Sequence, residues 1–177
     1  MKKILLTTAI IVIVILVGFF ALNTYIYNEK QGTPSDDYKN ASYIIDGKEI
    51  ILTNGLSEQK IPGSSAPLTT RYFGNEVTGD FNGDGTTDIA FILTQNSGGS
   101  GTFYYVVTAL HTQKGYRGTN AILLGDRIAP QTTETKGTRI LINYADRRPD
   151  EPLTAAPSVG VSRYFAIKEG TLVEIVE

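Results

Sequence analysis

The chain has 177 residues, enough for one domain with a sizeable hydrophobic core. It contains no cysteine, which excludes a disulfide framework, a cysteine-based zinc site and a thiol nucleophile. The formal net charge is −2, and lysine and arginine gather in no stripe, so the electrostatic pattern of a nucleic-acid-binding protein is missing and we expect no nucleic-acid partner.

The N-terminus carries an uncharged, apolar run, Ile4–Leu22, directly after Lys2 and Lys3. This run approaches the roughly 20 residues that a helix needs to cross a membrane. It is longer than the apolar region of a cleaved signal peptide, about 7–15 residues, and no small-residue cleavage site follows it. We therefore expect residues 1–27 to be an uncleaved signal anchor, with residues 4–22 as the single span. A cleaved signal peptide is the alternative.

The positive-inside rule places the two lysines in the cytoplasm and the rest of the protein outside. Residues 28–40 are polar, with Gly32 and Pro34, and predict a linker. The folded domain is then expected to cover residues 41–177. Its first element is a hairpin over Ser42–Leu52 that turns at Asp46-Gly47. The following segment, Gly55–Thr70, is expected to be a long loop without secondary structure.

The segment that carries the clearest chemistry is residues 80–88, DFNGDGTTD. Oxygen-bearing side chains recur in it at Asp80, Asn82, Asp84 and Asp88, and Gly85 permits a sharp turn with positive φ. Calcium takes six to eight oxygen ligands from carboxylates, amides and backbone carbonyls. We expect these four side chains and the carbonyl of Thr86 to bind one Ca²⁺ ion. A polar turn without an ion is the alternative, because Asn-Gly and Asp-Gly are common turn dipeptides.

This loop is not an EF-hand, because Phe91 stands where the EF-hand has its bidentate glutamate, and an apolar strand follows instead of a helix. Residues 79–90 resemble the calcium loops of FG-GAP repeats, the integrin-type propeller repeats, on Gly79–Gly85 and Asp88–Ala90. The resemblance implies a calcium site only. A propeller needs internal repeats, and the pattern occurs once.

The remaining elements are expected to be strands separated by glycine-containing turns. Apolar, aromatic and β-branched residues predict them at Asp88–Gln95, Thr102–His111, Thr119–Leu124, Thr138–Tyr144, Val161–Ile167 and Leu172–Val176. In the fourth of these, Ile140, Ile142 and Tyr144 should share one face. The fold class is therefore all-β or β-rich. We expect a single extracytoplasmic domain of antiparallel hairpins, a compact sandwich or barrel-like, after one N-terminal transmembrane helix.

The wider chain is similar to an uncharacterised bacterial family of membrane-anchored envelope proteins. The similarity lies in the runs RYFGNE, GDFNGDG, SGGSGTFYYV, LLGDRIAP and NYADR. This resemblance implies a location in the cell envelope and brings no activity with it.

Two Asp-Arg pairs, Asp126-Arg127 and Asp146-Arg147, are the other candidate chemistry. Paired carboxylates perform acid-base work in glycosidases. An adjacent arginine stabilises the ionised carboxylate, which disfavours a general acid, so we interpret both pairs as ion pairs at strand ends. The single histidine, His111, is expected to be a surface or edge residue. The many tyrosines can bind a sugar or peptide by stacking, but we expect them in the core with the hydroxyl at its rim.

Two functions from different classes remain. The first is a membrane-anchored, extracytoplasmic, calcium-binding β domain that acts as a binding or scaffold module of the bacterial cell envelope, with an envelope protein or glycan as partner and no catalytic residues. The alternative is an envelope glycan hydrolase that uses Asp126 and Asp146.

Overall fold

The computed structural model describes residues 12–22 and 32–176. The chain divides into two units, Met1–Lys30 and Gln31–Glu177. In the first unit, residues 12–22 are α-helical. This helix covers the second part of the apolar run Ile4–Leu22, and the rest of the expected anchor, residues 1–11 and 23–27, lies outside the described residues. None of the helices among the described residues combines the length and the apolar character of a membrane span.

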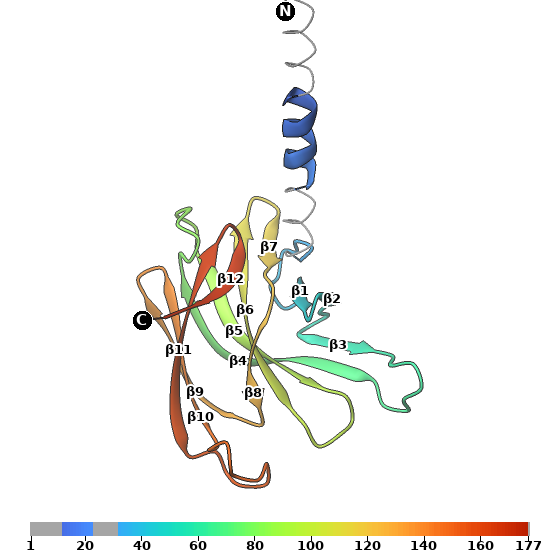
Figure 1. Ribbon diagram of the computed structural model, residues 1–177, viewed down its shortest axis with the longest axis vertical. Helices are drawn as coiled ribbons and strands as arrows, with labels where there is room; N and C mark the ends of the chain where they lie inside the picture. The colour runs from blue at the N-terminus through green and yellow to red at the C-terminus, as the bar shows by residue number, and fades with distance from the viewer. Residues whose placement is uncertain (1–11, 23–31, 177) are drawn as a thin grey trace, which may run out of the picture. The chain divides into compact units, whose positions relative to one another are not determined.

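The described residues of the second unit form strands in three antiparallel sheets (Figure 1). The predicted β-rich, antiparallel character is confirmed, and in this part of the chain no sheet closes into a barrel. The strands are β1 (Ser42–Ile45), β2 (Lys48–Ile51), β3 (Leu56–Gln59), β4 (Leu68–Gly79), β5 (Asp88–Asn96), β6 (Phe103–Thr112), β7 (Gly115–Gly118), β8 (Ile122–Asp126), β9 (Ala129–Lys136), β10 (Arg139–Asp146), β11 (Val159–Lys168) and β12 (Thr171–Ile175).

The hairpin predicted over Ser42–Leu52 is confirmed by β1 and β2, which pair from Ser42↔Ile51 to Ile45↔Lys48. Its two turn residues, Asp46 and Gly47, have φ of 50° and 76°. Positive φ at both central residues matches the twist of the flanking strands, and Asp-Gly adopts it readily. The closing hairpin, β11 and β12, turns in the same way at Glu169 and Gly170.

The six-stranded sheet is ordered β3-β4-β5-β6-β7, with β8 also paired to β6, and its central strands β5 and β6 are buried on both faces. Successive side chains of a strand point to opposite faces. In β5, Phe91 and Leu93 pack on one face against the β1–β2 hairpin, in a cluster that includes Tyr43 and Ile50. The sheet is therefore the middle layer of the domain.

On its other face, the central sheet packs against the four-stranded sheet, ordered β12-β11-β10-β9. Ile92 of β5 belongs to this second cluster, together with Ile140, Ile142 and Tyr144 of β10. The predicted shared face of these three β10 residues is confirmed. The two clusters bury most of the large apolar side chains of the domain.

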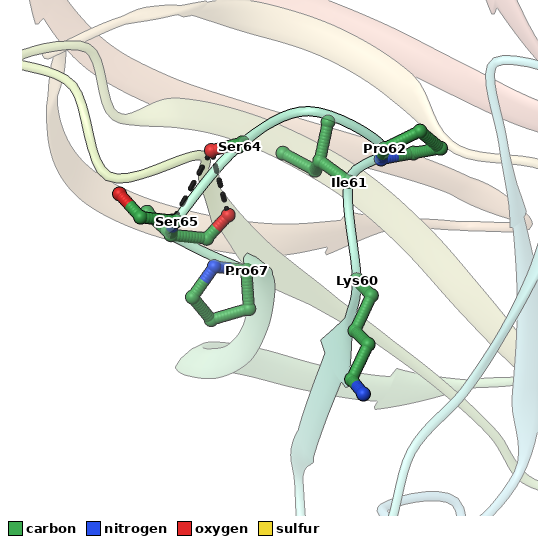
Figure 2. Close-up of a pocket in the computed structure, with 7 residues that line it drawn as sticks. Lys60, Ile61, Pro62, Ser64, Ser65 and Pro67 are labelled. Atoms are coloured by element: carbon green, nitrogen blue, oxygen red, sulfur yellow. Dashed lines mark hydrogen bonds between the residues drawn. The ribbon is translucent and has the colours of Figure 1, made fainter.

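The prediction of a long loop over Gly55–Thr70 is wrong. β3 and the first residues of β4 lie in it and pair from Leu56↔Arg71 to Gln59↔Leu68. Only residues 60–67 connect them, around a hollow of about 460 Å³ that is lined by residues of this loop (Figure 2). The Ser64 hydroxyl bonds the backbone of Ala66 across the turn. The sequence did not predict β3, because its four residues, LSEQ, include only one apolar residue and the strand is held by backbone pairing with β4.

Residues 32–40 also differ from the expected linker, because they belong to the same compact unit as the strands. We call them the strap. The Gly32 amide donates to the Gly118 carbonyl (2.8 Å), and Ser35 forms a bridge with Tyr116, so the strap pairs with the edge of β7. The compact unit therefore includes residues well before the expected start at residue 41. Residues 28–31 lie outside the described residues.

Candidate metal site and neighbouring carboxylates

The candidate loop, residues 80–87, joins β4 to β5 at one end of the central sheet. Phe81 anchors it, since this ring is only 2% exposed and packs in the second hydrophobic cluster. Gly83 and Gly85 have φ of 79° and 84°, so the backbone turns where the sequence predicted it. The side chains of Asn82 and Asp84 next to these glycines are exposed, whereas Phe81 fixes the loop to the core.

Asp80 organises the turn from inside. Its Oδ1 accepts hydrogen bonds from the amides of Gly83 (2.8 Å) and Asp84 (3.1 Å), and its Oδ2 accepts one from Gly85 (2.9 Å). Three backbone N–H groups therefore point at one carboxylate. This arrangement stabilises the tight turn of the loop.

Asn82 and Asp84 form the exposed side of the loop. Asp84 Oδ1 accepts bonds from the amide (2.8 Å) and hydroxyl (2.5 Å) of Thr86, and Asp84 Oδ2 accepts one from Asn82 Nδ2 (2.8 Å). The hydroxyl of Thr86, followed by Asn82, lowers the pKa of Asp84, so this carboxylate is ionised at neutral pH. The oxygen of the Asn82 side chain faces the Asp84 amide (3.0 Å).

Asp88 differs from the other three, because it is fully buried at 0% exposure. Its Oδ2 accepts a hydrogen bond from the Phe81 amide (3.0 Å), and its Oδ1 accepts one from the His111 amide (2.9 Å). Burial raises the pKa of Asp88, against the opposing effect of these amides. Asp88 thus fastens the start of the loop to the end of β6. No sequence signal identified this bond, since its partner His111 lies 23 residues away.

The chemistry of the donors suits a hard cation, since the four side chains offer only oxygen for coordination. Each carboxylate oxygen that accepts one amide keeps a further lone pair. Asn82 offers its nitrogen to Asp84 here, and its amide must turn to present oxygen in that direction. Within the described residues, no group of three or more histidine, aspartate or glutamate side chains is close enough together to hold a metal ion. The oxygens fit calcium in type, and ligation requires them to draw closer.

The ion pair predicted at Asp126 is confirmed. Arg127 Nη2 lies 2.7 Å from Asp126 Oδ2, and the Thr102 amide donates to Asp126 Oδ1 (2.9 Å). The Arg127 guanidinium is the main cause that lowers the pKa of Asp126. A carboxyl group held ionised in this way is a poor general acid.

The second pair is arranged differently from the prediction. Asp146 Oδ1 accepts a hydrogen bond from the backbone amide of Arg147 (2.7 Å). The Arg147 side chain donates to the carbonyls of Arg127 (2.9 Å) and Ala155 (2.5 Å), so it fastens two loops together. Arg147 therefore acts as a structural clamp between the loop after β8 and the loop after β10.

Among the described tyrosines, Tyr43, Tyr105 and Tyr144 follow the expected pattern of buried rings, whereas the others are partly exposed. Tyr43 and Tyr144 are buried, and their hydroxyls donate to the carbonyls of Tyr38 (2.6 Å) and Leu124 (3.2 Å). Tyr105 is buried as well, and burial raises its pKa to about 12. His111 is partly exposed at the end of β6, with its ring 5.2 Å from that of Tyr116, as expected for an edge residue.

Comparison of this chain with protein-family models, with curated proteins and with solved structures finds no match.

Proposed function

We propose that this protein is a membrane-anchored, extracytoplasmic, calcium-binding β domain that serves as a binding or scaffold module of the bacterial cell envelope. Asp80, Asn82, Asp84 and Asp88 would hold the ion by side chain and Thr86 by its carbonyl. Residues 4–22 would anchor the chain as a single span.

The observation that carries the calcium proposal is the wound backbone of the loop. Positive φ at Gly83 and Gly85, together with the three amides on Asp80, already gives residues 80–85 a tight turn. Binding would then require movement of exposed side chains, chiefly Asn82 and Asp84, and little refolding. A preformed site loses less conformational entropy on binding.

Calcium would supply positive charge where three carboxylates lie in nine residues. In its absence, backbone amides donate hydrogen bonds to Asp80 and Asp88 and so stabilise part of this negative charge. The ion would tie β4, which enters the loop, to β5, which leaves it. Magnesium would substitute poorly, because it demands octahedral geometry at about 2.0–2.1 Å and holds its water tightly.

The scaffold part of the proposal is supported by the layered, sandwich-like packing of the domain. Two hydrophobic clusters bury both faces of the central sheet. Charged side chains near the strand ends form interactions within the domain: Arg147 donates to the Arg127 carbonyl, and Asp126 pairs with Arg127. A glycan hydrolase built on Asp126 and Asp146 has less support, because Asp126 lacks the raised pKa that a general acid needs.

Isothermal titration calorimetry tests the calcium site directly. The metal-free full chain, in an uncharged detergent, should bind one Ca²⁺ ion, with Kd on the order of 10⁻⁴–10⁻³ M as in many extracellular modules. Asp84→Ala should abolish the heat of binding, whereas the matched carboxylate variant Asp126→Ala should keep it. Absence of binding by the wild type, or equal loss in both variants, would refute the proposed site.

A further inference from the structure

Two tyrosines and a glutamate form a cluster that is separate from the calcium loop. Glu76 of β4 accepts hydrogen bonds at Oε2 from the hydroxyls of Tyr72 (2.5 Å) and Tyr38 (2.9 Å). The rings of Tyr38 and Tyr72 lie 6.2 Å apart at an angle of 65°. Two aromatic faces and one carboxylate therefore surround the same space. We call these three residues the tyrosine cage.

A cation already occupies this space. The ammonium nitrogen of Lys39 lies 4.2 Å from the centre of the Tyr72 ring and 5.3 Å from that of the Tyr38 ring. Both distances are within the range of about 6 Å for a cation–π interaction. Lys39 belongs to the strap, so the chain places its own ammonium group in the cage.

The cage is held in place by groups other than the Lys39 side chain. Phe91 of the core packs against Tyr38 and Tyr72, at centroid distances of 5.5 and 5.3 Å. The Tyr43 hydroxyl donates to the Tyr38 carbonyl (2.6 Å), which fixes the backbone beside the ring. The rings and the carboxylate would therefore keep their positions if the lysine side chain swung away.

The cage is also accessible and charged. Glu76 is exposed, and Tyr38, Tyr72 and Lys39 are each half-buried. The hydroxyl of Tyr72 is the main cause that lowers the pKa of Glu76, so the carboxylate is ionised at neutral pH. A lysine side chain loses much rotamer freedom when it is held in one position, which favours its release to water.

We propose that Tyr38, Tyr72 and Glu76 form a recognition site for an ammonium group, which Lys39 fills in the free protein and an external ligand fills when Lys39 moves out. A quaternary ammonium group is weakly hydrated and interacts well with aromatic faces. The same chemistry is offered by a free quaternary ammonium compound and by the side chain of a lysine. In either case Lys39 acts as an internal competitor.

Titration with tetramethylammonium chloride tests this site, in the full chain with ¹³C-labelled tyrosine rings and a maltoside detergent that carries no ammonium group. Sodium chloride of equal concentration controls for ionic strength. The tyrosine resonances of Lys39→Ala should shift saturably, at concentrations on the order of millimolar. The wild type should need roughly tenfold more ligand, because Lys39 competes. A parallel titration with Nα-acetyl-lysine amide distinguishes the two sources of the ammonium group.

Two variants in the Lys39→Ala background assign the binding to the cage. Tyr72→Leu should abolish the saturable shift, and Glu76→Gln should weaken it several-fold while keeping a carbonyl oxygen for the hydroxyls. If Lys39→Ala is unfolded by circular dichroism, Lys39→Gln takes its place. No saturable shift in a folded Lys39 variant, or equal affinity in that variant and the wild type, would overturn the proposal. Calcium chelator is present throughout, so the outcome is independent of the metal site.

Discussion

Asp84 in the loop and Asp88 at the start of β5 lie four residues apart and have opposite environments. Asp84 is exposed and bonded to Thr86 and Asn82, whereas Asp88 is fully buried and accepts two backbone amides. A buried donor that loses its acceptor pays its full desolvation cost, while an exposed donor turns to water. The two carboxylates therefore make different contributions to stability before any ion binds.

Asp88→Ala should destabilise the domain strongly even with chelator present. It leaves the amides of Phe81 and His111 without their acceptors, which costs roughly 2–5 kcal/mol. Urea denaturation in chelator measures this loss, with Asp84→Ala as the matched control that should change little. Equal stability of the two variants would show that Asp88 has no structural role.

Asp126 gives a prediction for pH. Its folded-state pKa is lowered, chiefly by Arg127, from an unfolded value of about 3.9. The stabilisation is therefore present above about pH 4 and is lost as pH falls through the folded pKa. Asp126→Asn should lower the melting temperature by a few degrees at most at pH 6, because the pair is partly exposed.

The difference between Asp126→Asn and the wild type should shrink below about pH 4. Melting curves from pH 6 to pH 3 measure it. A difference that stays constant over this range would mean that the ion pair does not contribute to stability.

At the scale of elements, β7 and β1 approach each other closely at Gly118. A Cβ added at Gly118 of β7 would overlap the Ser42 carbonyl oxygen and the ring of Tyr43. Glu49 of β2 accepts hydrogen bonds from the hydroxyls of Ser42 (2.6 Å) and Thr33 (2.7 Å). The bond to Thr33 connects the strap to the β1–β2 hairpin. The space at this junction is filled by backbone, which cannot move aside as a flexible side chain can.

Gly118→Ala should therefore destabilise the domain by roughly 1–3 kcal/mol, the usual cost of forcing extra atoms into a packed site. Gly99→Ala is the matched control, because a Cβ there meets nothing within 4 Å. Chemical denaturation of both variants measures the difference. Indistinguishable curves would show that β1 moves aside easily at this contact.

The elements predicted from the sequence are those with strong local chemistry. Asp46-Gly47 predicted a hairpin because both residues readily adopt positive φ. The apolar runs predicted β5, β6 and β10, which are buried. β3, β7 and β9 escaped prediction because they are short or polar, as in APQTTETK, and gain stability from neighbouring strands. Likewise, the spacing of residues 80–88 predicted the turn of the loop, while the bond from Asp88 to β6 depends on tertiary structure.

At the scale of the whole molecule, the location of the domain is open to direct test. We predict that the strands lie outside the cytoplasm and remain attached through residues 4–22. Protease added to intact spheroplasts should digest the domain, and fractionation should place the full chain with membranes. A full-length soluble product, or a domain that resists digestion until the membrane is lysed, would contradict this topology.

The central claim is that one calcium ion binds in residues 80–88 and stabilises the domain. The most direct measurement is the melting temperature of the full chain, first shown to be metal-free, in chelator and in calcium at about 100-fold its Kd. Linkage then adds roughly 2.7 kcal/mol, which corresponds to a rise of roughly 5–10 °C for a domain of this size. Asp84→Ala should abolish the rise, and Asp126→Ala should retain it. An unchanged melting temperature in the wild type would contradict the claim.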